Sequence, residues 1–469
     1  MNTTDNTSAS NPLGYEPVGK LLRKFAIPSI IAMLVTSTYI IVDQVFIGNF
    51  VGEYGNAATN IVFPVITCCM SIALLFGIGG SSTFNLAQGR GENDKAPYYV
   101  GSSITMMASL GIIIGVLCLL FTDPILKFLG SPDSVVPYAS EYLKIIAIGL
   151  PALIMQAGGG HLVRADGSPR MTMIINLTGA VINIILDAIF VAGMNMGMTG
   201  AAIATIISQY IATIIVIIYL FHFKSAKLTA DTFIPRGFAV KESASLGVSS
   251  FFNQLAMMIT QIIFNNSLNY YGAQSIYGDS IPIAVSGIVI KVAQLLFGII
   301  IGIAQGLQPI ASFNYGAKQY DRVKRGYTIA IKSGMVVSLI SFIIFQVFPS
   351  QIIGLFGKGS ELYEQFGVLF FRITMFFVFL MFMQPISANF FSAIGKPLKS
   401  IFLSLTRQFI FLIPLVIALP MIFGFDGLLY AQPIADLLAV VTCTVLIVKE
   451  FKKPEYKDTE SFFISRRNK

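Results

Sequence analysis

Twelve long apolar stretches recur along the chain, and they constrain its fold more than any other feature. Each is close to or above 20 residues, the length that a helix needs to cross about 30 Å of hydrocarbon. Charged residues make up only 12% of the 469 residues, about half of the fraction in an ordinary soluble domain. We therefore predict an all-α polytopic membrane protein, with transmembrane helices at 24–49, 57–79, 98–121, 138–160, 171–194, 199–222, 244–269, 281–306, 327–348, 365–388, 398–422 and 427–448.

The basic residues outside these spans are divided unevenly between the two sides of the membrane. If the N-terminus lies inside, the outer loops carry only Lys127 and Lys358, and the other loop and tail Lys and Arg residues lie inside. This positive-inside pattern predicts a multi-pass protein of the plasma or inner membrane with both termini in the cytoplasm. The net charge of +8 thus follows from topology, and we expect no nucleic-acid partner. Residues 1–19 lack the apolar core of a signal peptide.

Two short inner-loop motifs repeat at nearly the same spacing. Phe84-Asn85-Leu86-Ala87 recurs as Phe313-Asn314-Tyr315-Gly316, an offset of 229 residues, and the turn at 165–169 recurs at 393–397, an offset of 228. Since six is an even number of spans, both halves enter the membrane from the same side. We predict two parallel six-helix bundles, related by a pseudo-twofold axis along the membrane normal, with a cavity between them. The expected parts are an N-terminal bundle (1–222), a cytoplasmic linker (223–243), a C-terminal bundle (244–450) and a cytoplasmic tail (451–469).

The N-terminal bundle has two acids inside its spans, Asp43 and Asp187. Each lies about 9 to 10 Å from the outer end of its helix. A carboxyl group inside a span is costly and is a functional-site hypothesis by default, although a structural hydrogen bond to a neighbouring helix is the alternative. Burial and a neighbouring like charge both oppose ionisation, so we expect the two acids to titrate as a pair and to hold the coupling cation. Further candidate members, any of which could serve only in helix packing, are Asn183, Tyr39, Thr36, Tyr142 and Thr205.

The C-terminal bundle has no acid at the position that corresponds to Asp43, which argues against an equivalent coupling site there. Arg407 and Asp436 lie on adjacent antiparallel spans, so we expect a structural ion pair. Lys291 is expected to be a lone buried ammonium that lines the cavity and repels cations; pairing with Asp436 and a part in coupling are the alternatives. The remaining candidates in this half are Gln254 and Gln384, and Gln384 marks either a break that faces the cavity or a helix-packing contact.

Several motifs resemble those of the multidrug and toxic compound extrusion (MATE) family of cation-coupled antiporters. They are Asp43-Gln44-Val45-Phe46-Ile47-Gly48, the segment Leu162–Arg170, and Asn183-x-x-x-Asp187. Together with the parallel repeat, the resemblance covers about residues 15–450. It implies a V-shaped pair of six-helix bundles that exports organic cations in exchange for protons or sodium. It also implies that Asp43, Asn183 and Asp187 belong to the polar cluster of the N-terminal half.

The alternative function is a flippase for lipid-linked saccharides of the related superfamily, which the basic residues Lys291, Arg372 and Arg407 favour. Twelve spans and the two N-terminal acids favour the antiporter. No Walker loop is present, and neither histidine has metal-ligand spacing, so we expect no enzymatic activity, metal or cofactor other than the coupling ion. The expected partners are small organic cations and the lipid bilayer, and the expected state is a monomer.

Overall fold

The computed structural model describes residues 11–278, 280–355 and 360–456, and within these ranges every regular element is a helix. The N-terminal half contains α1 (Pro12–Tyr15), α2 (Val18–Phe50), α3 (Glu53–Arg90), α4 (Ala96–Leu120), α5 (Thr122–Phe128), α6 (Val136–Ala165), α7 (Pro169–Asp187), the π-helix η1 (Ala188–Gly193) and α8 (Gly197–Leu220). The 3₁₀ helix η2 (Ala230–Phe233) lies in the linker. The C-terminal half contains α9 (Gly237–Gly272), α10 (Ser280–Gly316), α11 (Tyr320–Val347), α12 (Pro349–Leu355), α13 (Glu361–Thr374), η3 (Val378–Leu380), α14 (Met383–Ala393), α15 (Pro397–Leu405), the π-helix η4 (Thr406–Leu412), α16 (Ile413–Phe451) and η5 (Pro454–Tyr456). The predicted all-α class is confirmed.

Eleven segments of the described chain are long and apolar enough to span a membrane, and the last of them contains two crossings. This segment, Pro397–Phe451, has 55 residues and would extend about 80 Å as one helix, far more than a bilayer core. Gly424 interrupts it with φ 61° and ψ −147°. A side chain at Gly427 would collide with the backbone of Leu419, so the chain reverses direction here. The twelve predicted crossings are therefore present.

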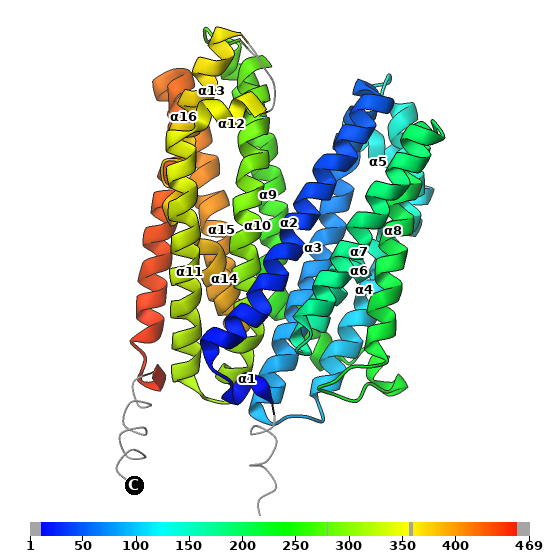
Figure 1. The fold of residues 1–469 in the computed structure, drawn as a ribbon, viewed down its shortest axis with the longest axis vertical. Coiled ribbons are helices and arrows are strands. Elements are labelled where there is room, and N and C mark those ends of the chain that lie inside the picture. Colours follow the sequence, from blue (N-terminus) through cyan, green and yellow to red (C-terminus); the bar gives the residue numbers. More distant parts are fainter. Residues whose placement is uncertain (1–10, 279, 356–359, 457–469) are drawn as a thin grey trace, which may run out of the picture.

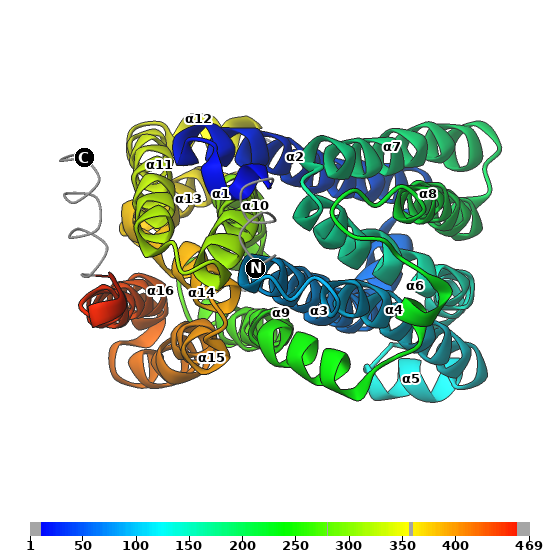
Figure 2. The ribbon, with the colours of Figure 1, turned by 90° about the horizontal axis from the view of Figure 1, so that it is seen from below.

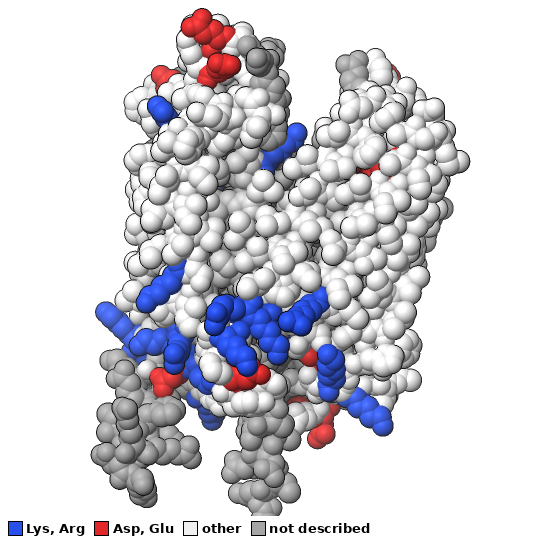
Figure 3. Space-filling model, in the orientation of Figure 1, with Lys and Arg blue, Asp and Glu red and all other residues white. Residues whose placement is uncertain are grey.

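The two halves form two lobes that meet at one end of the molecule and diverge at the other (Figure 1). α1 and η5 lie at the end where the lobes meet, and most Lys and Arg side chains visible in Figure 3 gather there. We call this the basic end and the opposite one the open end. Gly167 and Gly395 occupy equivalent points of the repeat, at φ 81° and φ 73°, a left-handed conformation that glycine adopts without strain. Lys358 lies outside the described residues.

The first helix of each half crosses toward the other half at the basic end. The lower part of α2 is packed in the core of the C-terminal half, and Ala239 of α9 is packed in the core of the N-terminal half. Gly302 lies so close to α2 that a Cβ atom there would be 2.6 Å from Ile30 Cγ1. Glycines allow such close approach of helices in membranes. The lobes are therefore joined firmly at the basic end and are separated by a cleft at the open end, as Figure 3 shows.

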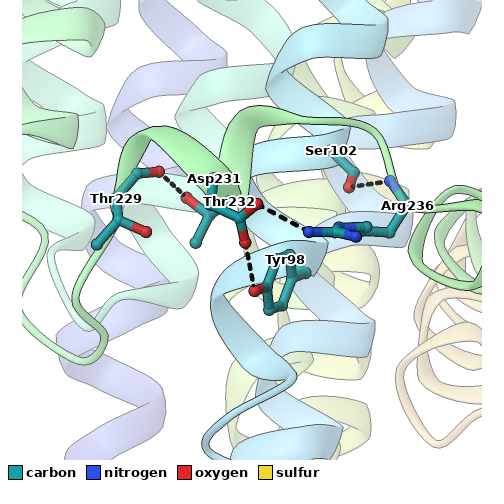
Figure 4. A network of polar contacts seen from close by, with 6 residues as sticks. All are labelled: Tyr98, Ser102, Thr229, Asp231, Thr232 and Arg236. Atoms are coloured by element: carbon teal, nitrogen blue, oxygen red, sulfur yellow. Dashed lines mark hydrogen bonds and ion pairs between the residues drawn. The ribbon is translucent and has the colours of Figure 1, made fainter.

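The linker is fastened to α4 by a small polar network (Figure 4). The Asp231 carboxylate accepts hydrogen bonds from the Tyr98 hydroxyl at 2.6 Å and from the Arg236 guanidinium at 2.8 Å. The Arg236 backbone N–H donates to Ser102 Oγ at 3.2 Å. The Tyr98 hydroxyl, together with the Arg236 guanidinium, holds the pKa of Asp231 below its usual range. No motif in the sequence indicates this network, which holds the linker along one face of the N-terminal lobe (Figure 2).

Candidate functional site

Two helices of the N-terminal lobe bring the predicted acids together. Asp43 lies in the upper part of α2, and Asp187 is the last residue of α7, which packs against α2. The side chain of Asp187 is completely buried and that of Asp43 is half-buried. The two carboxyl groups lie within hydrogen-bonding reach of each other. Asp187 directly precedes the π-helix η1, and π turns occur frequently at functional sites.

This acid pair has no basic partner in the described part of the chain. No nitrogen of a described Lys, Arg or His residue lies within 4.0 Å of either carboxyl group. Among the described atoms, Asp43 Oδ1 and both Asp187 oxygens are buried without a hydrogen-bond donor. Ionised carboxylates only accept hydrogen bonds and repel each other. The pair is therefore stable only when a proton or a small cation neutralises part of its charge, which is the chemistry of a cation site.

Most of the other predicted N-terminal residues surround this pair. Tyr39 and Tyr142 lie close enough to both acids for the carboxylate charges to act on their phenol groups. Asn183 Nδ2 donates to Thr205 Oγ1 at 3.5 Å, and Asn183 Oδ1 is buried without a partner among the described residues. Tyr39 and Tyr142 thus lie near the acids, and Asn183 lies one helical turn before Asp187 on α7. The coupling role of these four residues stays a prediction.

Thr36 and Gln44 differ from the expectation. The Thr36 hydroxyl donates at 2.8 Å to the Ala32 carbonyl of its own helix, so its hydrogen bond is local. Gln44 lies close to the Asp43 side chain, and its Nε2 lies 3.4 Å from Thr59 Oγ1. Helix spacing does not place Gln44 in the site, because neighbouring residues of a helix point to different faces. A neutral amide inside an apolar span was the available signal.

The C-terminal lobe contains the expected ion pair. Arg407 Nε donates to Asp436 Oδ1 at 2.6 Å, and the two side chains are 14% and 2% exposed. Gln384 lines the same small cavity, which has a volume of about 10 Å³, enough for about one water molecule. The amide Nε2 of Gln384 donates to the Leu403 carbonyl at 3.1 Å. The predicted pairing of Arg407 with Asp436 is confirmed, and this acid is neutralised by the protein itself.

The structure corrects the expectation for Lys291. Its side chain is exposed and not buried, and within the described ranges no carboxylate oxygen lies within 4.0 Å of its ammonium group. The alternative pairing with Asp436 is wrong, because Arg407 occupies that position. Gln254 is half-buried on α9.

The predicted helix at 365–388 is interrupted in its middle. α13 ends at Thr374 and α14 begins at Met383, with only the short η3 between them. Gln384 is the second residue after the break, next to Pro385, whose ring lacks a backbone donor. Both alternatives given for Gln384 have a counterpart here: the helix breaks just before it, beside the Arg407–Asp436 cavity, and its side chain makes a packing contact with Leu403.

Known proteins match the chain along most of its length. The sequence profile described as MatE matches residues 28–189 and 247–418. "Multidrug export protein MepA" from Staphylococcus haemolyticus (strain JCSC1435) is 27% identical over 425 residues, which are 89% of this chain and 90% of the relative. The protein of the same name from Staphylococcus aureus (strain MSSA476) is 25% identical over 433 residues, 92% and 94% of the two chains.

Solved structures show the same fold. An outward-facing multidrug resistance MATE family transporter of the MOP superfamily superposes with a TM-score of 0.87 at 22% identity, covering 96% of this chain and 100% of that one. A MOP superfamily transporter from Pyrococcus furiosus Vc1 (DSM3638), noted for the reverse polarity of its binding pocket, gives a TM-score of 0.87 at 21% identity with the same coverage.

Proposed function

Because the chain belongs to the MATE family of multidrug efflux transporters, we propose that it exports organic cations in exchange for protons or sodium by alternating access. The observation that carries the proposal is the acid pair Asp43–Asp187, which is buried in the N-terminal lobe without a described basic partner. Such a pair binds one positive charge at a time and can release it.

The exchange follows from the charge of this pair. When Asp43 and Asp187 hold a proton or sodium ion, the N-terminal lobe presents little negative charge to the cleft. When the ion leaves, the pair is more negative and attracts a cationic substrate. Coupling requires that the two ligands favour different states of the protein, because a ligand with equal affinity for both states shifts nothing. Because the ion and the substrate compete for one acid pair, they do not load together, and each favours its own loaded state of the protein.

α2 connects the acid pair to the joint between the lobes. Asp43 lies in its upper part, whereas Ala26 and Ile30 in its lower part pack against Gly306 and Gly302 of α10. Pro28 lies between these two contacts and lacks the N–H that would complete the helical ladder. α2 is nevertheless one continuous helix in this structure. We propose that loading the acid pair bends α2 at Pro28 and changes the angle between the lobes.

The distribution of basic residues supports an orientation for this cycle. Lys and Arg gather at the basic end (Figure 3), which we assign to the cytoplasm by the positive-inside rule. The open end then faces outward, so that substrate leaves from the cleft and the coupling ion enters through it. We further propose that the protein acts as a monomer in the plasma or inner membrane.

Gradient-dependent efflux tests this function. Cells that express the chain should expel ethidium, and dissipating either the proton gradient or the sodium gradient should stop the efflux and thereby identify the ion. Asp43→Asn should remove the coupling. Coupled efflux at the wild-type rate in the Asp43→Asn variant would contradict the proposal. A change in lipid-linked oligosaccharides without drug efflux would instead support the flippase function.

A further inference from the structure

Lys291 lies on the face of α10 that turns toward the N-terminal lobe. On this face, Gly298 packs on Met33 and Gly302 packs on Ile30 of α2. Lys291 precedes Gly298 by seven residues, which is two helical turns, so it projects on the same side about 10 Å nearer the open end. The lobes have separated at this level, and the lysine is exposed. Figure 3 shows basic atoms on the wall of the cleft between the lobes.

Neutral amides continue this wall along α9. Gly247 packs directly on Leu75 of α3, and Gln254 and Gln261 follow at seven and fourteen residues, so they lie on the same helical face toward the open end. Gln261 Nε2 donates to Asn265 Oδ1 at 2.9 Å. These amide groups offer hydrogen-bond donors on a helix that packs against α10, which carries Lys291.

The same wall carries no competing acid. The only Asp or Glu in the sequences of α9 and α10 is Glu242. It lies near the basic end, where it accepts a hydrogen bond from the Tyr99 hydroxyl at 2.6 Å. Toward the open end, Lys291 is therefore the only charged side chain of these two helices, and Asp43 follows Met33 on α2 by ten residues, about 15 Å toward the open end. Lys291 and Asp43 therefore lie at similar heights, with opposite charges, on helices that pack against each other nearer the basic end.

We propose that Lys291 is a specificity-determining residue that binds an anionic group of the substrate. The substrate class is then amphoteric: an organic molecule with a cationic group directed to the acid pair and a carboxylate directed to Lys291 and the α9 amides. This inference rests on the proposed export function, which it refines by naming a second charge on the substrate. A substrate with only a positive charge, such as ethidium, lacks this second contact and is partly repelled by Lys291, so the lysine favours the amphoteric molecule without excluding the cation.

Two dyes that differ in one charge test this inference. Rhodamine B carries a cationic ring system and a carboxylate, and its ethyl ester carries the cation alone. Initial rates of gradient-driven efflux of both dyes are measured with the full chain in proteoliposomes, and the ratio of the two rates is compared between variants. The ratio cancels differences in the amount of folded protein.

Lys291→Met should lower rhodamine B efflux about two- to fivefold, the effect of an exposed ion pair, and should raise efflux of the ester. Lys291→Glu should shift the ratio further in the same direction, and Lys291→Arg should keep the wild-type ratio. Lys127→Met is the matched control, because Lys127 is an exposed lysine on α5, on the outer side of the N-terminal lobe (Figures 1 and 2). It should change neither rate.

Equal changes of both dyes in Lys291→Met would overturn the inference and show a merely structural role. Wild-type protein that carries the ester but not rhodamine B would also overturn it, while leaving the proposed function intact. Failure to carry either dye under any ion gradient would overturn both.

Discussion

The two lobes bury acids in comparable surroundings but neutralise them in opposite ways. In the N-terminal lobe, Asp187 faces Asp43, and neither has a basic partner in the described chain. In the C-terminal lobe, Asp436 has Arg407 Nε at 2.6 Å. A π-helical turn adjoins each site: Asp187 precedes η1, and Arg407 lies within η4. This difference shows that the charge of a buried acid is fixed or exchangeable according to its partner. The position of the acid in the fold matters less.

The fixed charge of the C-terminal lobe should matter mainly for stability. Arg407→Met leaves the buried Asp436 without its counter-charge and should destabilise the protein by about 3–5 kcal/mol, whereas Arg407→Met with Asp436→Leu should recover most of this loss. Thermal unfolding in detergent measures both variants, with Lys127→Met as the control. If Arg407→Met alone were as stable as the wild type, the ion pair would not stabilise the fold.

The exchangeable charge of the N-terminal lobe should matter mainly for transport. Asp187→Asn removes one of the two charges and should lower gradient-driven efflux about 5- to 150-fold, the range of typical coupling free energies. Asp187 has no basic partner among the described residues, so the substitution leaves no Lys or Arg without a counter-charge. Thermal stability should therefore remain near that of the wild type. Substrate accumulation in proteoliposomes measures the effect. A large loss of stability with transport retained would reverse the roles assigned to the two lobes.

The comparison also requires that the lobes be joined at the basic end. Gly302→Val places atoms within about 3 Å of Ile30 on α2 and should cost about 1–3 kcal/mol through overpacking. Gly287→Val on the same helix is the matched control, since nothing lies within 4 Å of a Cβ atom there. Thermal unfolding of the two variants distinguishes them. Equal stability would show that the contact between α2 and α10 is not tight.

Outside the membrane, Asp231 is another acid whose charge is fixed by partners from the protein itself. Its pKa is held below the usual range by Tyr98 and Arg236, so the ionised acid favours the folded state. This contribution is present at neutral pH, above the unfolded pKa of about 3.9, and is lost as pH falls through the lower folded pKa. Asp231→Asn should therefore cause a small decrease in Tm at neutral pH that shrinks in acid. A decrease that does not depend on pH would contradict this account.

The sequence was sufficient for the architecture, because hydrophobic length and charge asymmetry act along the chain itself. The repeat motifs placed Gly167 and Gly395 at equivalent turns, and helix depth placed Asp43 beside Asp187. Pairing of Arg407 with Asp436 also followed from depth on adjacent spans. These features depend on helical geometry, which sequence spacing determines directly.

The sequence was insufficient where a side chain's surroundings depend on the angle between the lobes. Lys291 was expected to be buried because its span is apolar, but the diverging lobes expose it. The contact of Asp231 with Tyr98 joins segments more than 100 residues apart along the chain, and no local pattern indicates it. Gln44 was missed because its contact with Asp43 departs from ideal helix spacing.

The most direct test of the central claim is the affinity for ethidium measured as a function of pH and of sodium concentration. Binding of ion and substrate to one acid pair is reciprocal, so raising the coupling ion must weaken substrate binding. The account predicts that wild-type protein loses affinity as either protons or sodium ions increase, and that the double variant Asp43→Asn with Asp187→Asn loses this dependence. An ion dependence that persists unchanged in the double variant would contradict the account.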